Sequence, residues 1–186
     1  MNGQRRSRRR DGPGRAGFTL VELLVVAIVM ALLAVSALPA FDRVAAARRA
    51  AAANQVERLL TVARAAAMAT GQPIGVRIDP GAGEGGTLSL IRYDTQGGDV
   101  GPFIGYDGSP HAGSDIGIEF PGVRIVGVTH GDGSSGAGVI WFGQGGTPHL
   151  RDEDGTYTGG FVVDAVIVVT GDEAVTVTRQ SGMIER

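Results

Sequence analysis

The sequence predicts an α+β protein in which a long N-terminal helix packs on an antiparallel β-sheet domain. Residues 18–41 form an apolar run. Only four residues interrupt it: Thr19, Glu22, Ser36 and Pro39. Residues 40–70 contain neither glycine nor proline and are rich in alanine, as the interior of a helix requires. After Gln72, short runs of β-forming residues alternate with glycine-rich turns.

The charges divide the 186 residues into four segments. The net charge is −2, but residues 1–17 hold six arginines and one aspartate, which gives +5. Residues 18–41 contain a single ionisable side chain, and residues 42–71 hold five arginines and two acids. Residues 72–186 hold six arginines and fifteen acids, or −9. We therefore expect a basic leader, an apolar span, the amphipathic half of a helix and an acidic globular domain.

The apolar run is long enough to cross a bilayer, which takes about 20 residues as a helix. The leader arginines should hold the N-terminus in the cytoplasm while the rest of the chain is exported. A secretory signal peptide cut near residues 37–40 and a plain signal anchor are alternatives, but neither explains Glu22. A charged side chain is costly in hydrocarbon and usually marks a function. A twin-arginine export signal would need apolar residues directly after the arginine pairs, and these are missing.

The second half of the helix should be amphipathic. Its apolar residues recur at spacings of three and four, which places them on one helical face. They are Val56, Leu59, Leu60, Ala63 and Ala67. Gly71 provides a C-terminal stop, and Pro73 follows two residues later. A continuous helix over residues 18–70 would be about 80 Å long.

About seven strands are expected in residues 72–186. The candidates are Ile74–Asp79, Thr87–Asp94, Ile116–Phe120, Val123–Val128, Gly138–Phe142, Phe161–Thr170 and Ala174–Arg179. Residues 165–169 are apolar throughout, so we predict that they form a central strand. The glycine-rich stretch of residues 95–114 should be an exposed loop.

The start of the apolar run resembles the class III signal of type IV pilins and type II secretion pseudopilins. The residues that carry this resemblance are Gly17-Phe18-Thr19-Leu20-Val21-Glu22, followed by Leu23-Leu24-Val25. The resemblance implies that a prepilin peptidase cuts after Gly17 and methylates the new amine of Phe18. It also implies that Glu22 neutralises the amine of a neighbouring subunit during filament assembly. Pro39 lies where family members often have a proline that interrupts the helix, and loss of a hydrogen bond there would permit a kink.

The C-terminal third is similar to the GspH/FimT subfamily of minor pseudopilins. The similarity is a pattern of strands and glycine-bearing turns. It rests on residues 139–143, Gly145, Gly146, residues 165–170, residues 175–178 and Gly182.

Other chemistry finds little support in the sequence. The chain has no cysteine, which excludes disulfides and cysteine-bound zinc. It also has no lysine, and because a P-loop requires one, a P-loop is excluded. Three histidines stand in separate glycine-rich stretches and are expected to be exposed: His111, His130 and His149. Residues 152–155 are the strongest metal candidate, but they lack the full spacing of a calcium loop and are expected to be a solvated acidic turn. We expect no cofactor and no metal.

The resemblance as a whole implies a structural minor pseudopilin of the type II secretion system. Its partners would be the prepilin peptidase, the major and other minor pseudopilins, the inner-membrane assembly platform and, before assembly, the lipid bilayer. The chain would cross the inner membrane once, with its C-terminal domain in the periplasm, and it would have no catalytic role.

Two alternatives remain. A FimT-like minor type IV pilin would serve DNA uptake or pilus assembly, but nucleic acid is not the expected partner of an acidic domain whose C-terminal arginines, Arg179 and Arg186, are sparse. An enzyme with a signal anchor would mature at Ala40 or not at all.

Overall fold

The computed structural model describes residues 18–186 except 106, 112 and 153. The chain divides into two compact units, Met1–Asp42 and Arg43–Arg186. Helix α1 (Leu20–Thr70) begins in the first unit and ends in the second. The structure confirms the predicted α+β class, in which a long N-terminal helix is combined with antiparallel sheets.

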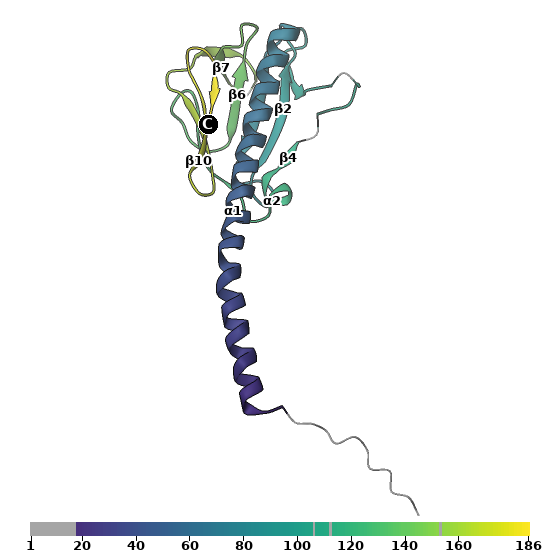
Figure 1. Cartoon of the computed structure of the whole chain (residues 1–186). Helices are drawn as coiled ribbons and strands as arrows, with labels where there is room; N and C mark the ends of the chain where they lie inside the picture. Colours follow the sequence, from purple (N-terminus) through teal and green to yellow (C-terminus); the bar gives the residue numbers. More distant parts are fainter. Residues whose placement is uncertain (1–17, 106, 112, 153) are drawn as a thin grey trace, which may run out of the picture. The chain divides into compact units, whose positions relative to one another are not determined.

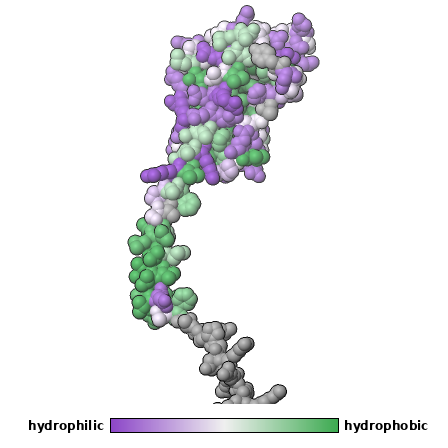
Figure 2. All heavy atoms as spheres, turned by 45° about the vertical axis from the view of Figure 1, so that its right-hand side comes forward, coloured by the Kyte–Doolittle hydropathy of each residue, from purple (hydrophilic) through white to green (hydrophobic). Residues whose placement is uncertain are grey.

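The described part of the first unit is the apolar beginning of α1. Its large hydrophobic side chains are exposed, from 47% for Val29 to 81% for Leu20. Figure 2 shows them as a green surface around the helix. By length and composition this helix can cross a membrane. The helix continues through Pro39, which has no N–H for the helical ladder, and the predicted kink there stays a prediction.

In the second unit, α1 buries the apolar face that the sequence predicts. The residues at 2% exposure or less are Ala52, Ala53, Val56, Leu59, Leu60, Ala63 and Ala67. Four of these seven are alanines, so much of the buried face consists of small side chains. The helix ends at Thr70, and Gly71 follows with a φ of 70° while its N–H donates to Ala67 O at 3.0 Å. The predicted glycine stop is therefore confirmed.

Eleven strands in the described residues form two antiparallel sheets. The larger sheet has the order β3-β2-β1-β6-β7-β8, and β4 also pairs with β2. Its strands are β1 (Ile74–Asp79), β2 (Thr87–Tyr93), β3 (Val100–Pro102), β4 (Ser114–Asp115), β6 (Gly138–Phe142), β7 (Pro148–Arg151) and β8 (Tyr157–Gly160). The smaller sheet has the order β11-β10-β9-β5. Its strands are β5 (Ile125–Thr129), β9 (Ala165–Val169), β10 (Glu173–Val177) and β11 (Ile184–Glu185).

One hydrophobic core joins the second half of α1 to both sheets. Alternate residues of β1 and β6 point into it, among them Ile74, Val76, Ile140 and Phe142. Figure 1 shows this half of the helix alongside β2 and β6. Strand β9 lies between β10 and β5, which confirms the predicted central strand, although only every second residue of it is fully buried.

Arg64 of α1 ties both sheets to the helix at their turns. Its Nε donates to Gly146 O at 3.1 Å, in the turn between β6 and β7. One of its terminal nitrogens donates to Ser181 O at 3.0 Å, between β10 and β11. A single guanidinium therefore contacts a turn of each sheet.

The structure corrects several sequence-based expectations. Residues 116–120 were expected to form a strand, but Ile116–Glu119 is a short helix, α2. The Asp115 side chain accepts hydrogen bonds from the N–H groups of Gly117 and Ile118, and this N-cap favours a helical turn. The short strands β3, β4, β7, β8 and β11 were not predicted. His130 and His149 were expected to be exposed, but each is only 7% exposed.

Replacing Leu60 by alanine should destabilise the second unit by about 2–5 kcal/mol, because its fully buried side chain would leave a cavity between the helix and the sheets. Val62, two residues away and 37% exposed, is the matched control, and Val62→Ala should cost less than about 1 kcal/mol. Urea unfolding of the full chain in detergent, followed by tryptophan fluorescence, measures both. Equal effects would show that Leu60 is not a core residue.

Candidate functional site

The predicted assembly residue Glu22 lies in the first turn of α1, where it forms a capping box with Thr19. The Thr19 backbone N–H donates to Glu22 Oε2 at 2.9 Å, and the Thr19 hydroxyl donates to the same oxygen at 3.1 Å. In return, the Glu22 N–H donates to Thr19 Oγ1 at 3.2 Å. Each residue thus satisfies a free donor of the other at the helix start. The capping role of Thr19 was not predicted from the sequence, although the spacing Thr-x-x-Glu is typical of a capping box.

The capping box leaves the charge of Glu22 without an ionic partner among the described residues. Both hydrogen bonds from Thr19 reach Oε2, and none from a described residue reaches Oε1. The helix start stabilises a carboxylate through the aligned peptide dipoles. A full charge in hydrocarbon still needs a cation nearby to offset its desolvation. The geometry therefore leaves one carboxylate oxygen available to a cation.

The other predicted site residues are placed as follows. Phe18 precedes the helix and is 77% exposed. Gly17, the predicted cleavage residue, lies outside the described residues. Pro39 lies within α1, seventeen positions after Glu22 and with an exposed side chain.

A second candidate site lies on the outer face of the seven-stranded sheet, away from the core. Trp141 of β6 is the only tryptophan in the chain and is 2% exposed. It pairs in register with Gly75 of β1. A Cβ on Gly75 would lie 2.9 Å from the indole and 2.7 Å from Val139, so only glycine leaves room for the ring. The indole therefore lies across the backbone of β1.

Arg151 of β7 is held next to this ring by four contacts. Its guanidinium carbon lies 4.6 Å from the ring centroid of Tyr93 and 5.9 Å from that of Trp141. Its Nε donates to His149 Nε2 at 2.8 Å, and a terminal nitrogen donates to Gly155 O. Cation–π stacking and two hydrogen bonds thus fix the arginine in one position.

His149 acts as a neutral acceptor in this arrangement. Burial, together with the positive charge of Arg151, lowers the pKa of His149 from 6.5 to about 4. The imidazole is consequently uncharged at neutral pH, and its Nε2 can accept the hydrogen bond from Arg151. The histidine positions the arginine without neutralising it.

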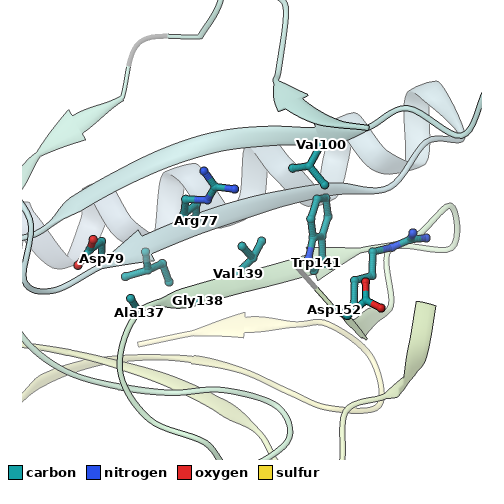
Figure 3. Close-up of a pocket in the computed structure, with 10 residues that line it drawn as sticks. Arg77, Asp79, Val100, Ala137, Gly138, Val139, Trp141 and Asp152 are labelled. Atoms are coloured by element: carbon teal, nitrogen blue, oxygen red, sulfur yellow. The ribbon is translucent and has the colours of Figure 1, made fainter. Parts of the chain in front are cut away.

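Trp141 and Arg151 line an open pocket of about 450 Å³, which we call the outer pocket. Its lining includes Arg77, Val100, Val139, Trp141 and Arg151. Figure 3 shows Asp79 and Asp152 at opposite ends of the pocket, with Arg77, Val139 and Trp141 between them. The sequence did not predict this site.

Comparison with known families finds a match for the N-terminal segment. The model of the prokaryotic N-terminal methylation motif matches residues 13–38. This stretch contains Gly17, Phe18 and Glu22, and the match supports the type IV pilin-like class, which includes pilins and pseudopilins. Proteins with this motif are structural, and the motif implies processing by a prepilin peptidase and assembly into a pilus or pseudopilus. Neither a curated protein nor a solved structure matched the chain.

The pKa of His149 predicts a pH dependence of stability. The unfolded state binds a proton near pH 6.5 and the folded state only near pH 4, so stability should fall as the pH drops through this interval. Above about pH 7 the histidine is neutral in both the folded and the unfolded state, so it does not make the free energy of unfolding depend on pH. His149→Gln should reduce the loss between pH 6.5 and 4 by about 1–2 kcal/mol, after allowance for solvent screening.

Urea unfolding of both proteins from pH 4 to 8 measures this difference. The two stability curves should run parallel above pH 7 and diverge below pH 6.5. Curves that stay parallel over the whole range would contradict the neutral state of His149.

Proposed function

We propose that this protein is a structural minor pseudopilin of the type II secretion system, of the GspH/FimT kind. It would be inserted in the bacterial inner membrane with a single span, with its C-terminal domain in the periplasm. After cleavage behind Gly17 it would assemble near the tip of a periplasmic pseudopilus that drives protein export. It would have no catalytic activity of its own.

The observation that carries this proposal is the methylation motif together with the carboxylate that the fold places at the start of an exposed apolar helix. Cleavage before Phe18 would create an amine four residues before Glu22. In a filament, the free Oε1 of Glu22 would accept the amine of a neighbouring Phe18. Ammonium and carboxylate would then offset each other's desolvation in an apolar environment. Partners in this step are other pseudopilins, and the earlier partners are the peptidase, the lipid bilayer and the assembly platform.

Three features favour secretion over DNA uptake. The charge of residues 72–186 is −9, which opposes a phosphate backbone. Arg186 is paired with Glu173 at 2.7 Å and also donates to Asn54. Arg179 donates to Val162 O. The two C-terminal arginines are therefore engaged within the domain.

Processing can be tested with the full chain expressed together with a prepilin peptidase. The mature protein should begin with N-methylated Phe18, as mass spectrometry of its N-terminal peptide would show. Gly17→Leu should leave the precursor uncut, because the bulky side chain blocks the cleavage position. Gly14→Leu, in the same leader, is the control and should be cut normally. Maturation at Ala40, or cutting of the Gly17→Leu protein, would refute the assignment.

The role of Glu22 can be separated from its role as a helix cap. Glu22→Gln keeps an oxygen that can accept the Thr19 hydrogen bonds but removes the charge, whereas Glu22→Ala removes both. If charge pairing drives assembly, both variants should be inserted and cleaved, yet should enter sheared filaments at least about tenfold less, since one ion pair is lost at each contact. Immunoblotting of the filaments measures this. Normal incorporation of the glutamine variant would show that only the cap is required.

A further inference from the structure

The turn between β7 and β8 contacts a distant strand of the same sheet. We call Arg151, Asp152 and residues 154–157 the flap. The guanidinium carbon of Arg151 lies 4.6 Å from the ring centroid of Tyr93, which belongs to β2. A Cβ at Gly155 would overlap the same ring, so the backbone of the flap also lies against Tyr93. Because β1 and β6 separate β2 from β7, these contacts reach across two intervening strands.

The flap helps to cover Trp141. This residue lies on the outer face of β6, yet it is only 2% exposed. The guanidinium carbon of Arg151 lies 5.9 Å from its ring centroid. Arg151 lines the outer pocket and also a second open pocket of about 510 Å³, which we call the second pocket. The arginine thus borders open space in two pockets, and it can move without displacing a core residue.

One hydrogen bond of Arg151 depends on the protonation state of its partner. Nε of Arg151 donates to Nε2 of His149 at 2.8 Å, so Nε2 must carry a free lone pair. The imidazole also makes a hydrogen bond with the Thr147 backbone that favours the protonated ring, as a bond donated to a carbonyl does. The ring proton is therefore assigned to Nδ1, and both ring nitrogens are engaged.

A proton on Nε2 of His149 would break the hydrogen bond to Arg151. The new N–H group would face the N–H of the guanidinium, and two donors cannot form a hydrogen bond with each other. The imidazolium would also place a second positive charge beside the arginine. Burial, followed by this charge, accordingly lowers the pKa of His149 to about 4.

The other charged groups around His149 do not compensate for a positive ring. The histidine lines the second pocket together with Arg151 and Arg179, and no acidic side chain is among the described residues that line it. On β8, the ring of Tyr157 lies 5.7 Å from the imidazole, centroid to centroid. Asp152 attracts Arg151 and lines the outer pocket. Protonation of His149 would therefore drive the arginine away from the imidazole and towards Asp152.

We propose that His149 and Arg151 form an acid-sensitive latch, which holds the flap over Trp141 at neutral pH and releases it when the imidazole binds a proton. The released guanidinium would give up its hydrogen bonds to His149 and Gly155 and move into the outer pocket beside Asp152. Release of the flap is a local opening of the native domain and differs from global unfolding. The latch does not involve the helix start, so it does not depend on the proposed function.

Acrylamide quenching of Trp141 measures the opening, because this is the only tryptophan in the chain. The full chain in detergent micelles is titrated from about pH 7.5 to about pH 3.5 without denaturant. A pKa lowered from 6.5 to about 4 makes proton binding to the closed latch weaker by on the order of a hundredfold. The ratio of open to closed flap should rise by a similar factor over this interval. Quenching should therefore increase reversibly, while the far-UV circular dichroism stays unchanged.

Variants separate the latch from other effects of acid. His149→Gln keeps a neutral group that can accept from Arg151 but cannot take up a proton, so Trp141 should stay protected throughout the titration. Arg151→Gln removes the guanidinium, so Trp141 should be accessible at neutral pH and should change little on acidification. Arg124→Gln removes a positive charge from an exposed residue outside the flap, and this control should respond to pH as the unaltered chain does.

Four results would overturn the latch. Quenching could stay constant in the unaltered chain, or it could rise equally in the His149→Gln protein. It could also rise together with a loss of far-UV circular dichroism, which would show global unfolding instead of release of the flap. The Arg151→Gln protein tests the closed state on its own, because quenching at neutral pH equal to that of the unaltered chain would show that the arginine does not hold the flap.

Discussion

The buried alanine-rich face of α1 is the contact on which the second unit depends. The core contains residues of this face and of both sheets. Ala63 and Ala67 are fully buried in this core, and the larger side chains of Leu59 and Leu60 fill the space between the helix and the sheets. A larger residue at an alanine position would force the sheets outward, because protein interiors are close-packed. The alanines that favour a helix therefore also form part of its packed face.

The start of the helix is subject to a different constraint. Its large apolar side chains whose exposure the structure describes are exposed in the isolated chain, so lipid or other helices would have to cover them. In either environment, the carboxylate of Glu22 is the side-chain group whose desolvation costs the most free energy. The capping box with Thr19 satisfies hydrogen bonds but not charge. An isolated chain therefore keeps an electrostatic cost, which the proposed pairing of Glu22 with the amine of a neighbouring subunit would relieve.

Much of the fold could be predicted because the main patterns are local. The periodicity of α1, the stop at Gly71 and the bounds of β1 and β6 follow from short stretches of sequence. The strand prediction for residues 116–119 was wrong. The two isoleucines suggest a strand, but the hydrogen bonds that the Asp115 side chain accepts at the helix start favour a helical turn. Strand β7, Pro148–Arg151, is too short and too polar to show a period, and it exists because β6 and β8 lie beside it.

The two candidate sites also differ in how far they can be predicted from local sequence. The helix-start site is continuous in sequence, and its motif is readable directly. The outer pocket combines residues of β1, β6 and β7, whose adjacency appears only once the sheet is formed. Gly75 carries no chemical signal of its own, yet its missing side chain creates the place for Trp141.

Arg64 has a consequence for how the second unit opens. Its guanidinium binds the β6–β7 turn of one sheet and the β10–β11 turn of the other. Neither turn can leave the helix without breaking a hydrogen bond at this shared residue. Local openings of the two sheets are thereby linked, so the second unit should behave as one cooperative element rather than as two that fray independently. In a subunit that is pulled by its helix, a force on α1 would reach both sheets through the same side chain.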